Sequence, residues 1–196
     1  MEALALVAHP DDETIWMGGT ILQNKNWNWT IVSLCRKADP DRQPKFVKVC
    51  KHYNATPIIS DLDDEKLHDL STEEVVKKIQ EVLPKKNFDV IYTHGKNGEY
   101  GHKRHKEVHR AVKKMLSEKQ LKCDKVFYFA YENSKQTFPG MLSLHIALPR
   151  ADAKTRTTLT KDNFKKKRML IISEYGFRGD SFEALCCNQI ETFDKK

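Results

Sequence analysis

The sequence of 196 residues lacks any run of about 18 consecutive apolar residues, the length that a membrane-spanning helix requires. It also lacks a basic N-terminal region with an apolar segment and a cleavage site, so we predict no signal peptide. Its five cysteines contain no Cys-x-x-Cys pair, and their odd number argues against a secreted disulfide framework. We therefore expect a cytoplasmic protein without a membrane span, in which Cys35 and Cys50 are small buried apolar residues.

No internal repeat, low-complexity tract or long linker interrupts the chain. Hydrophobic residues make up 39% of it, which is typical of globular rather than disordered chains. The length suits one domain with a substantial core. We expect a single domain over residues 1–196, with its core in 1–132 and a less regular C-terminal part in 133–196.

A nucleic-acid-binding motif is also missing, as is any basic stretch interleaved with stacking aromatic residues, so we predict no nucleic-acid partner. The net charge of +7, from 34 basic and 27 acidic residues, nevertheless attracts anionic molecules. A phosphorylated or carboxylated small-molecule substrate would benefit from it. The cationic run at 165–168 is interpreted as a solvated helix face, and a homo-oligomer is compatible with this composition.

Short apolar runs alternate with segments of helical periodicity along the first two thirds of the chain. The predicted strands are residues 4–8, 29–34, 57–62, 89–93 and 126–131. The predicted helices are residues 16–23, 46–53, 71–83 and 102–115. This alternation is typical of a Rossmann-like, doubly wound α/β fold, with a mostly parallel sheet and helices on both faces. Further on, we expect a loop at 134–140, a strand at 142–148 and helices at 160–173 and 182–193.

The first strand leads into the sequence Ala-His-Pro-Asp-Asp-Glu, residues 8–13, at the edge where open α/β sheets bind ligands. Asp11 and Asp12 are adjacent carboxylates, which repel each other unless a cation or a shared proton relieves them. His9 and Asp12 are a suitable nitrogen and oxygen ligand pair for a zinc-like ion, and Asp11 is then free to take a proton from water. A simpler interpretation is that the two aspartates cap the following helix.

A second cluster, Gly-Glu-Tyr-Gly-His-Lys-Arg-His at residues 98–105, follows the predicted strand at 89–93. On a helix His102 and His105 are three positions apart and His105 and His109 four, so neighbouring histidines share a face. A lone histidine is more often a surface residue, whereas three on one stripe after a strand favour a metal site. A Rossmann-type nucleotide site is disfavoured, because no Gly-rich phosphate loop follows the first strand.

The stretch at residues 8–13, followed by Gly-Gly-Thr at 18–20, resembles the start of the LmbE-like, or PIG-L-like, family of zinc-dependent N-deacetylases. The segment at 101–105 resembles the second metal motif of that family, His-Pro-x-His or a relaxed form of it. The likeness covers residues 1–112. By position, it implies that His9, Asp12 and His105 are the zinc ligands.

The same resemblance implies roles for further residues. Asp11 corresponds to the general base, and His102 to the histidine that positions or stabilises the reacting carbonyl group. Tyr100 occupies the place of a tyrosine that assists the oxyanion in some relatives. Arg42 is similar in position to an arginine that touches substrate, and Asp64 to an acidic residue after the third strand, so the resemblance implies that both bind substrate.

Two departures from the family pattern stand out. Lys103-Arg104 replaces the Pro-Asp that many relatives carry inside the second motif, so we expect the groups around His105 to differ. Many relatives also use a late histidine in the active site, and His145 is the one candidate for it in this sequence.

The resemblance implies hydrolysis of an N-acetyl amide on an N-acetylglucosamine-type sugar or sugar conjugate, with Zn²⁺ as the cofactor. Ligation by two histidines and an aspartate also accommodates Fe, Co or Ni. One alternative keeps the metal and makes the protein an amidase of a small non-sugar N-acyl compound. Another is a non-catalytic binding module on the same fold, in which Asp11→Asn would leave function unchanged.

Overall fold

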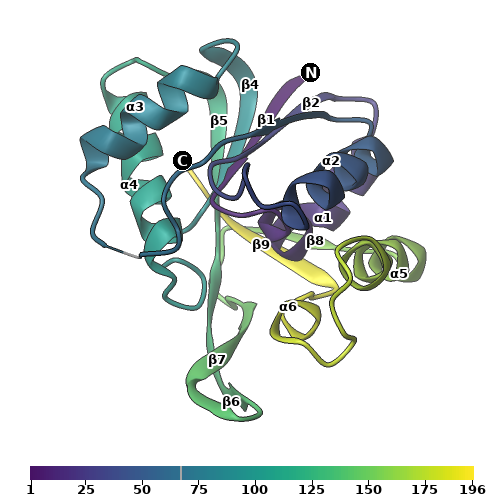
Figure 1. The fold of residues 1–196 in the computed structure, drawn as a ribbon. Helices are drawn as coiled ribbons and strands as arrows, with labels where there is room; N and C mark the ends of the chain where they lie inside the picture. Colours follow the sequence, from purple (N-terminus) through teal and green to yellow (C-terminus); the bar gives the residue numbers. More distant parts are fainter. Residues whose placement is uncertain (67) are drawn as a thin grey trace.

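The centre of the computed structural model, which describes residues 1–66 and 68–196, is a seven-stranded sheet in the order β3-β2-β1-β4-β5-β9-β8 (Figure 1). Its strands are Glu2–Val7 (β1), Asn28–Ser33 (β2), Thr56–Ile59 (β3), Asn87–Thr93 (β4), Lys122–Phe129 (β5), Thr155–Thr158 (β8) and Ile190–Lys195 (β9). Neighbours among β1 to β5 pair in parallel, whereas β9 pairs antiparallel with both β5 and β8. The sheet is therefore mostly parallel, as predicted.

Helices cover both faces of this sheet (Figure 1). They are Asp12–Gln23 (α1), Arg42–Tyr53 (α2), Thr72–Val82 (α3), Lys103–Ser117 (α4), Lys161–Met169 (α5) and Phe182–Leu185 (α6), with a π-helical turn at Leu170–Glu174 (η1). Side chains of β1 alternate between two cores, with Ala3, Ala5 and Val7 packed with α1 and α2, and Leu4 and Leu6 packed with α3 and α4. Burial on both faces explains the nearly continuous apolar run of β1 and confirms the predicted α/β fold class.

The order of the strands places a crevice at the carboxyl ends of β1 and β4. These two strands are neighbours, but the chain leaves β1 toward β2 and β3 and leaves β4 toward β5 on the other side. Connections that depart in opposite directions leave a gap between them, which is where doubly wound sheets bind ligands. Both predicted motifs follow these strands, so the fold brings them to one edge.

The predicted loop at 134–140 is wrong for most of its length. Tyr131–Phe138 (β6) pairs antiparallel with Met141–Pro149 (β7), and the two form a hairpin that projects from the sheet (Figure 1). The polar residues of β6 are largely exposed on this hairpin, so they carry no apolar alternation that would indicate a strand. The strand predicted at 142–148 is present as β7.

The predicted helix at 182–193 is also wrong, because only α6 is helical there and β9 enters the main sheet between β5 and β8. Glu191 of β9 is fully buried and accepts hydrogen bonds from the backbone N–H groups of Gly19 and Thr20, each at 2.8 Å. Its partner Lys167 is equally buried, with Nζ 2.8 Å from Glu191 Oε1. The interpretation of the run at 165–168 as a solvated face is therefore wrong for Lys167.

Other local predictions differ from the structure at element ends. α1 begins at Asp12 rather than residue 16, because its first turn consists of polar residues that carry no apolar periodicity. Ser71 caps α3 in a capping box with Glu74, as the sequence indicates. Cys35 and Cys50 are buried and free, as expected. Among the described residues, no helix combines the length and the apolar character that a bilayer crossing demands.

Candidate metal centre and active site

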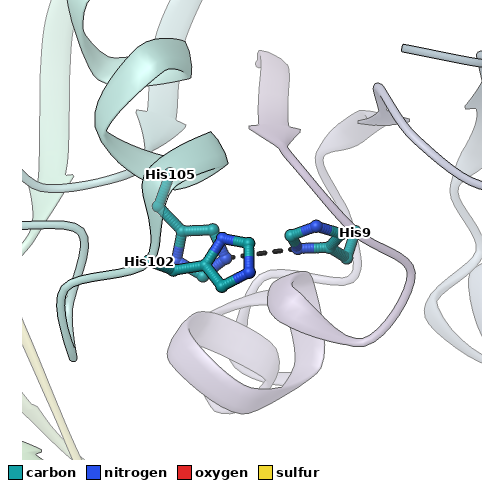
Figure 2. Close-up of side chains that lie close together, drawn as sticks. All are labelled: His9, His102 and His105. Carbon is teal, nitrogen blue, oxygen red and sulfur yellow. Dashed lines mark hydrogen bonds between the residues drawn. The ribbon is translucent and has the colours of Figure 1, made fainter. Parts of the chain in front are cut away.

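Three candidate ligand atoms from the two motifs converge at the crevice. His9 Nδ1 lies 3.2 Å from Asp12 Oδ2 and 3.2 Å from His105 Nε2, and His105 Nε2 lies 3.3 Å from Asp12 Oδ2. Figure 2 shows the imidazoles of His9 and His105 pointing toward each other, with His102 beside them. The loop after β1 supplies His9, the first turn of α1 supplies Asp12, and the first turn of α4 supplies His105.

The outer nitrogen of each imidazole faces a carboxylate. His105 Nδ1 is 2.5 Å from Glu99 Oε2, and His9 Nε2 is 3.0 Å from Asp64 Oδ1. Because an ionised carboxylate only accepts hydrogen bonds, these outer nitrogens carry the protons. In the neutral imidazoles the lone pairs therefore lie on the inner nitrogens, toward Asp12. Carboxylate partners of this kind orient metal-binding histidines in many proteins.

Asp12 is held as an ionised carboxylate. Burial raises its pKa, but the neighbouring His105 and His94 outweigh burial and hold that pKa well below its usual range. Its Oδ1 accepts the indole N–H of Trp16 at 2.9 Å, one helical turn along α1, and its Oδ2 accepts the backbone N–H of His9 at 2.8 Å. Neither oxygen can turn away without losing a hydrogen bond.

The geometry of these three atoms fits a tetrahedral transition metal. A tetrahedron with bonds of about 2.0–2.1 Å to nitrogen and oxygen has edges of about 3.3 Å, and the three observed separations are 3.2, 3.2 and 3.3 Å. Two neutral imidazoles and a carboxylate are a donor set typical of Zn²⁺. The residues present therefore fit a divalent cation with three protein ligands.

Asp11 does not cap α1 through its side chain. It occupies the N-cap position of α1 with φ 108°, and its side chain makes no capping hydrogen bond. A non-glycine residue at positive φ is strained, at a cost of about 1–3 kcal/mol. Its Oδ2 instead accepts a hydrogen bond from Arg42 Nη1 at 2.7 Å. Burial, together with the charge of Asp12, raises the pKa of Asp11 well above its usual range.

A cavity of about 390 Å³ opens beside the three ligand atoms. Seven of the eight predicted site residues line it, namely His9, Asp11, Asp12, Arg42, Asp64, Tyr100 and His102. His105, the eighth, is fully buried behind them. The Nδ1 atom of His102 is buried and has no hydrogen-bond partner among the residues that the structure describes. Burial, with the charges of His105 and His9, lowers the pKa of His102 to about 3, so its imidazole is neutral.

Two predicted substrate-binding residues contact other site residues. Arg42 holds Asp11, and its guanidinium lies 4.5 Å from the centre of the Phe177 ring. Asp64 holds His9 and accepts a hydrogen bond from Arg36 Nη2 at 2.6 Å. Burial raises the pKa of Asp64, but these hydrogen bonds lower it to about 2. Asp64 is therefore placed to orient the imidazole of His9.

Of the other candidate histidines, His102 lies beside the convergent atoms, with its ring centre 4.7 Å from that of His9 and 4.6 Å from that of His105, whereas His109 and His145 make their contacts elsewhere. His102 is the extended N-cap of α4 rather than a helical residue, so the predicted stripe of three does not exist. His109, farther along α4, binds the carbonyl oxygen of His94 through Nδ1 at 2.9 Å. His145 lies on the β6–β7 hairpin, where Nδ1 is 3.0 Å from the carbonyl oxygen of Ser134.

Sequence reasoning missed the groups that support the ligands. Glu99 binds His105, and its Oε2 also lies 2.9 Å from Nδ1 of His94. The Nε2 of His94 accepts the backbone N–H of Ala8 at 2.9 Å, which ties β4 to the loop of the first motif. Glu99 lies in the second motif segment, and His94 directly follows β4. These positions are the sequence signal by which both residues could have been assigned to the site.

Arg104, which departs from the family pattern inside the second motif, has a structural role. This side chain is fully buried, and it donates hydrogen bonds to the carbonyl oxygens of Asp63 and His68 at 2.5 and 2.9 Å. It also binds Glu107 at 2.6 Å. Arg104 therefore fastens α4 to the segment that carries Asp64, and so supports His9 indirectly.

The chain is similar to several known proteins. A family model described as PIG-L, GlcNAc-PI de-N-acetylase, matches residues 4–116. An uncharacterized protein of Acanthamoeba polyphaga mimivirus is 23% identical over 126 residues, which is 57% of this chain and 56% of the relative, so the chain spans about half the length of that relative.

Two solved deacetylase structures share the fold. One is a deacetylase triple mutant involved in the teicoplanin biosynthetic pathway, with a TM-score of 0.61, 15% identity and coverage of 89% of this chain and 81% of that one. The other is a deacetylase of an antimicrobial pseudoaglycone, with a TM-score of 0.58, 11% identity and the same coverage of 89% and 81%.

The family model covers more than half of the chain, from β1 through α4. Both motifs lie inside it, and they supply the three convergent candidate ligand atoms. On this evidence the chain belongs to the PIG-L family, whose model is described as GlcNAc-PI de-N-acetylase.

Proposed function

We propose that the protein is a zinc-dependent hydrolase that removes the acetyl group from an N-acetylglucosamine-type sugar or sugar conjugate. The observation that carries this proposal is the triangle of His9 Nδ1, Asp12 Oδ2 and His105 Nε2, whose edges of 3.2–3.3 Å fit a tetrahedral cation. Family membership supports the N-deacetylase chemistry. A divalent cation held by these atoms would lower the pKa of water and polarise the acyl oxygen.

Asp11 acts as the general base in this proposal. It lines the cavity directly before the ligand Asp12, and its raised pKa increases its affinity for a proton. A base whose pKa lies nearer to the working pH transfers protons more effectively in both directions. Arg42 fixes the carboxylate through its 2.7 Å hydrogen bond. Once protonated, Asp11 can return the proton to the leaving amine.

His102 and Tyr100 supply hydrogen-bond donors for the oxyanion that develops on the acyl oxygen. The neutral imidazole of His102 carries one N–H group, and its unpartnered Nδ1 is available to a ligand. Burial raises the pKa of Tyr100, so its phenol stays protonated. Both groups therefore keep a proton at neutral pH, as an oxyanion donor must.

Asp11→Asn tests the proposal. We expect the rate of acetate release from N-acetylglucosamine to fall by about 10²–10⁴ because the base is lost, while zinc affinity measured by calorimetry is retained. Asp124→Asn, which changes an exposed carboxylate at the amino end of β5, is the matched control and should leave the rate unchanged. Equal rates for Asp11→Asn and wild type would refute the role of Asp11.

The substrate class is tested separately. Acetate release from small non-sugar N-acetyl compounds, with none from N-acetyl sugars, would favour the amidase alternative. Tight zinc binding without hydrolysis of either class would favour the binding module.

A further inference from the structure

The C-terminal part of the chain reaches the contacts of Asp11 from outside the segment that the family model matches. The π-helical turn η1 leads into Tyr175, Gly176 and Phe177. Tyr175 contacts the first turn of α1, and Phe177 contacts the first residue of α2. Gly176 between them has a φ of 79°, which glycine adopts without strain. One short turn therefore presents two aromatic side chains to the two helices that hold Asp11.

Tyr175 reaches the backbone of Asp11 through Glu13. The hydroxyl group of Tyr175 donates to Glu13 Oε1 at 2.8 Å, and Glu13 Oε2 accepts the backbone N–H of Asp11 at 3.1 Å. Glu13 is fully buried and Tyr175 is 2% exposed, so this chain of hydrogen bonds is shielded from solvent. The strained φ of 108° at Asp11 persists only where surrounding contacts enforce it. The buried carboxylate of Glu13 provides such a contact.

Phe177 reaches the carboxylate of Asp11 through Arg42. The guanidinium carbon of Arg42 lies 4.5 Å from the centre of the Phe177 ring, a distance typical of a cation–π interaction. The same guanidinium donates from Nη1 to Asp11 Oδ2 at 2.7 Å. A guanidinium that lies on an aromatic ring has fewer alternative orientations toward solvent. The backbone and the carboxylate of Asp11 are thus each held by a residue that contacts an aromatic side chain of the same turn.

We propose that the turn at residues 175–177 positions the general base, with Tyr175 acting through Glu13 and Phe177 acting through Arg42. The inference rests on the proposed function, because it concerns the base of the same site. Neither aromatic side chain belongs to the cavity lining, so both are positioning residues rather than catalytic ones. Displacement of a base lowers the rate of the chemical step more than it weakens substrate binding.

Tyr175→Phe, which removes one hydroxyl group, is the first test. We expect kcat for acetate release from N-acetylglucosamine to fall about tenfold, with KM and zinc affinity within about twofold of wild type. In the ¹⁵N-labelled, zinc-loaded protein the amide resonance of Asp11 should shift, because its acceptor Glu13 has lost a hydrogen bond. Tyr128→Phe makes the same change in the core on the other face of the sheet and should leave the rate and this resonance unchanged.

Phe177→Leu removes the aromatic ring and keeps an apolar side chain at a half-buried position, so it also serves if Tyr175→Phe does not fold. Loss of a cation–π contact should lower kcat by about two- to fivefold and shift the side-chain Nε resonance of Arg42. In an Asp11→Asn background, each substitution should change the residual rate by less than about twofold, because the base is already lost.

A wild-type kcat in both variants, an unshifted Asp11 amide in Tyr175→Phe, or the same fold-losses in the Asp11→Asn background would overturn the proposal. The last result would mean that the turn supports the structure in general rather than Asp11. The two resonances require no turnover. Absence of acetate release by the wild-type protein would therefore refute the hydrolase, whereas the expected shifts would still support the contacts between the turn and Asp11.

Discussion

Glu99 contacts two buried histidines with one carboxylate, so Glu99→Gln isolates the contribution of the groups behind the proposed metal ligands. Its Oε2 is 2.5 Å from His105 Nδ1 and 2.9 Å from His94 Nδ1, and its Oε1 accepts the backbone N–H of Gly95 at 2.7 Å. Glutamine keeps the size of the side chain but offers one accepting oxygen in place of two. The amide NH₂ group of the glutamine must then face either the N–H of Gly95 or the two imidazoles, so that a hydrogen-bond donor meets another donor.

The expected effect has two parts. Loss of the carboxylate behind a ligand histidine typically weakens metal binding by about 10–100-fold, which is about 1.4–2.7 kcal/mol. The buried donor that is left without a partner lowers the free energy of unfolding of the metal-free protein by about 1–3 kcal/mol. For a chain of this length that corresponds to a melting temperature lower by roughly 2–12 °C.

Calorimetric titration of zinc into metal-stripped protein measures the first part, and thermal unfolding of the same samples measures the second. Glu132→Gln, at an exposed site, should match wild type in both assays. His105→Ala, which removes a ligand atom, should weaken zinc binding more than Glu99→Gln does. A folded Glu99→Gln protein with wild-type zinc affinity would refute the reasoning that this carboxylate sets the orientation of His105.

Three further predictions concern stability. Arg104→Met leaves Glu107 buried without its 2.6 Å partner, so we expect urea denaturation to show a loss of about 3–5 kcal/mol, and an unchanged midpoint would contradict the role of this pair. Gly95→Ala places a Cβ 2.2 Å from a backbone carbonyl oxygen of β5 and should cost about 1–3 kcal/mol, whereas Gly179→Ala, whose Cβ meets an atom only at 3.8 Å, should stay within about 0.5 kcal/mol of wild type. Zinc at about 1,000 times its dissociation constant should stabilise the wild-type protein by about 4 kcal/mol in thermal unfolding, and the same stabilisation of His105→Ala would argue against the proposed ligand set.

Local patterns were sufficient for the fold class and for the convergence of the two motifs. Apolar runs and helical periodicity depend on neighbouring residues, so they predicted the alternation of β1 to β5 with α1 to α4. Once strands and helices alternate, chain geometry places the segments after β1 and β4 at one sheet edge. That is why His9, Asp12 and His105 could be predicted as neighbours although about a hundred positions separate them.

The supporting groups could not be predicted in this way. Glu99 contacts His105, and its backbone adopts a positive φ of 58°, a conformation that has no sequence signal in a non-glycine residue. Arg104 looked like a substitution within a motif, but its partners lie on the segment around Asp63, which is adjacent only in the folded chain. Hydrogen-bond partners across the fold depend on the packing of whole elements, and a local pattern does not contain that information.

By itself, the sequence determined the order of the first strands and helices and the sheet edge that carries the site, and its resemblance to a known family indicated the three candidate ligands. Only the tertiary structure decided the sheet position of β9, the burial of Lys167 against Glu191, and the place of Phe182 and Glu183 in the cavity lining. A charged pair inside a core removes the apolar signal from both of its segments, because each charge is stabilised by a partner far away in the chain. The sequence pattern therefore predicts elements that bury apolar side chains, whereas elements that bury paired charges can be recognised only in the tertiary structure.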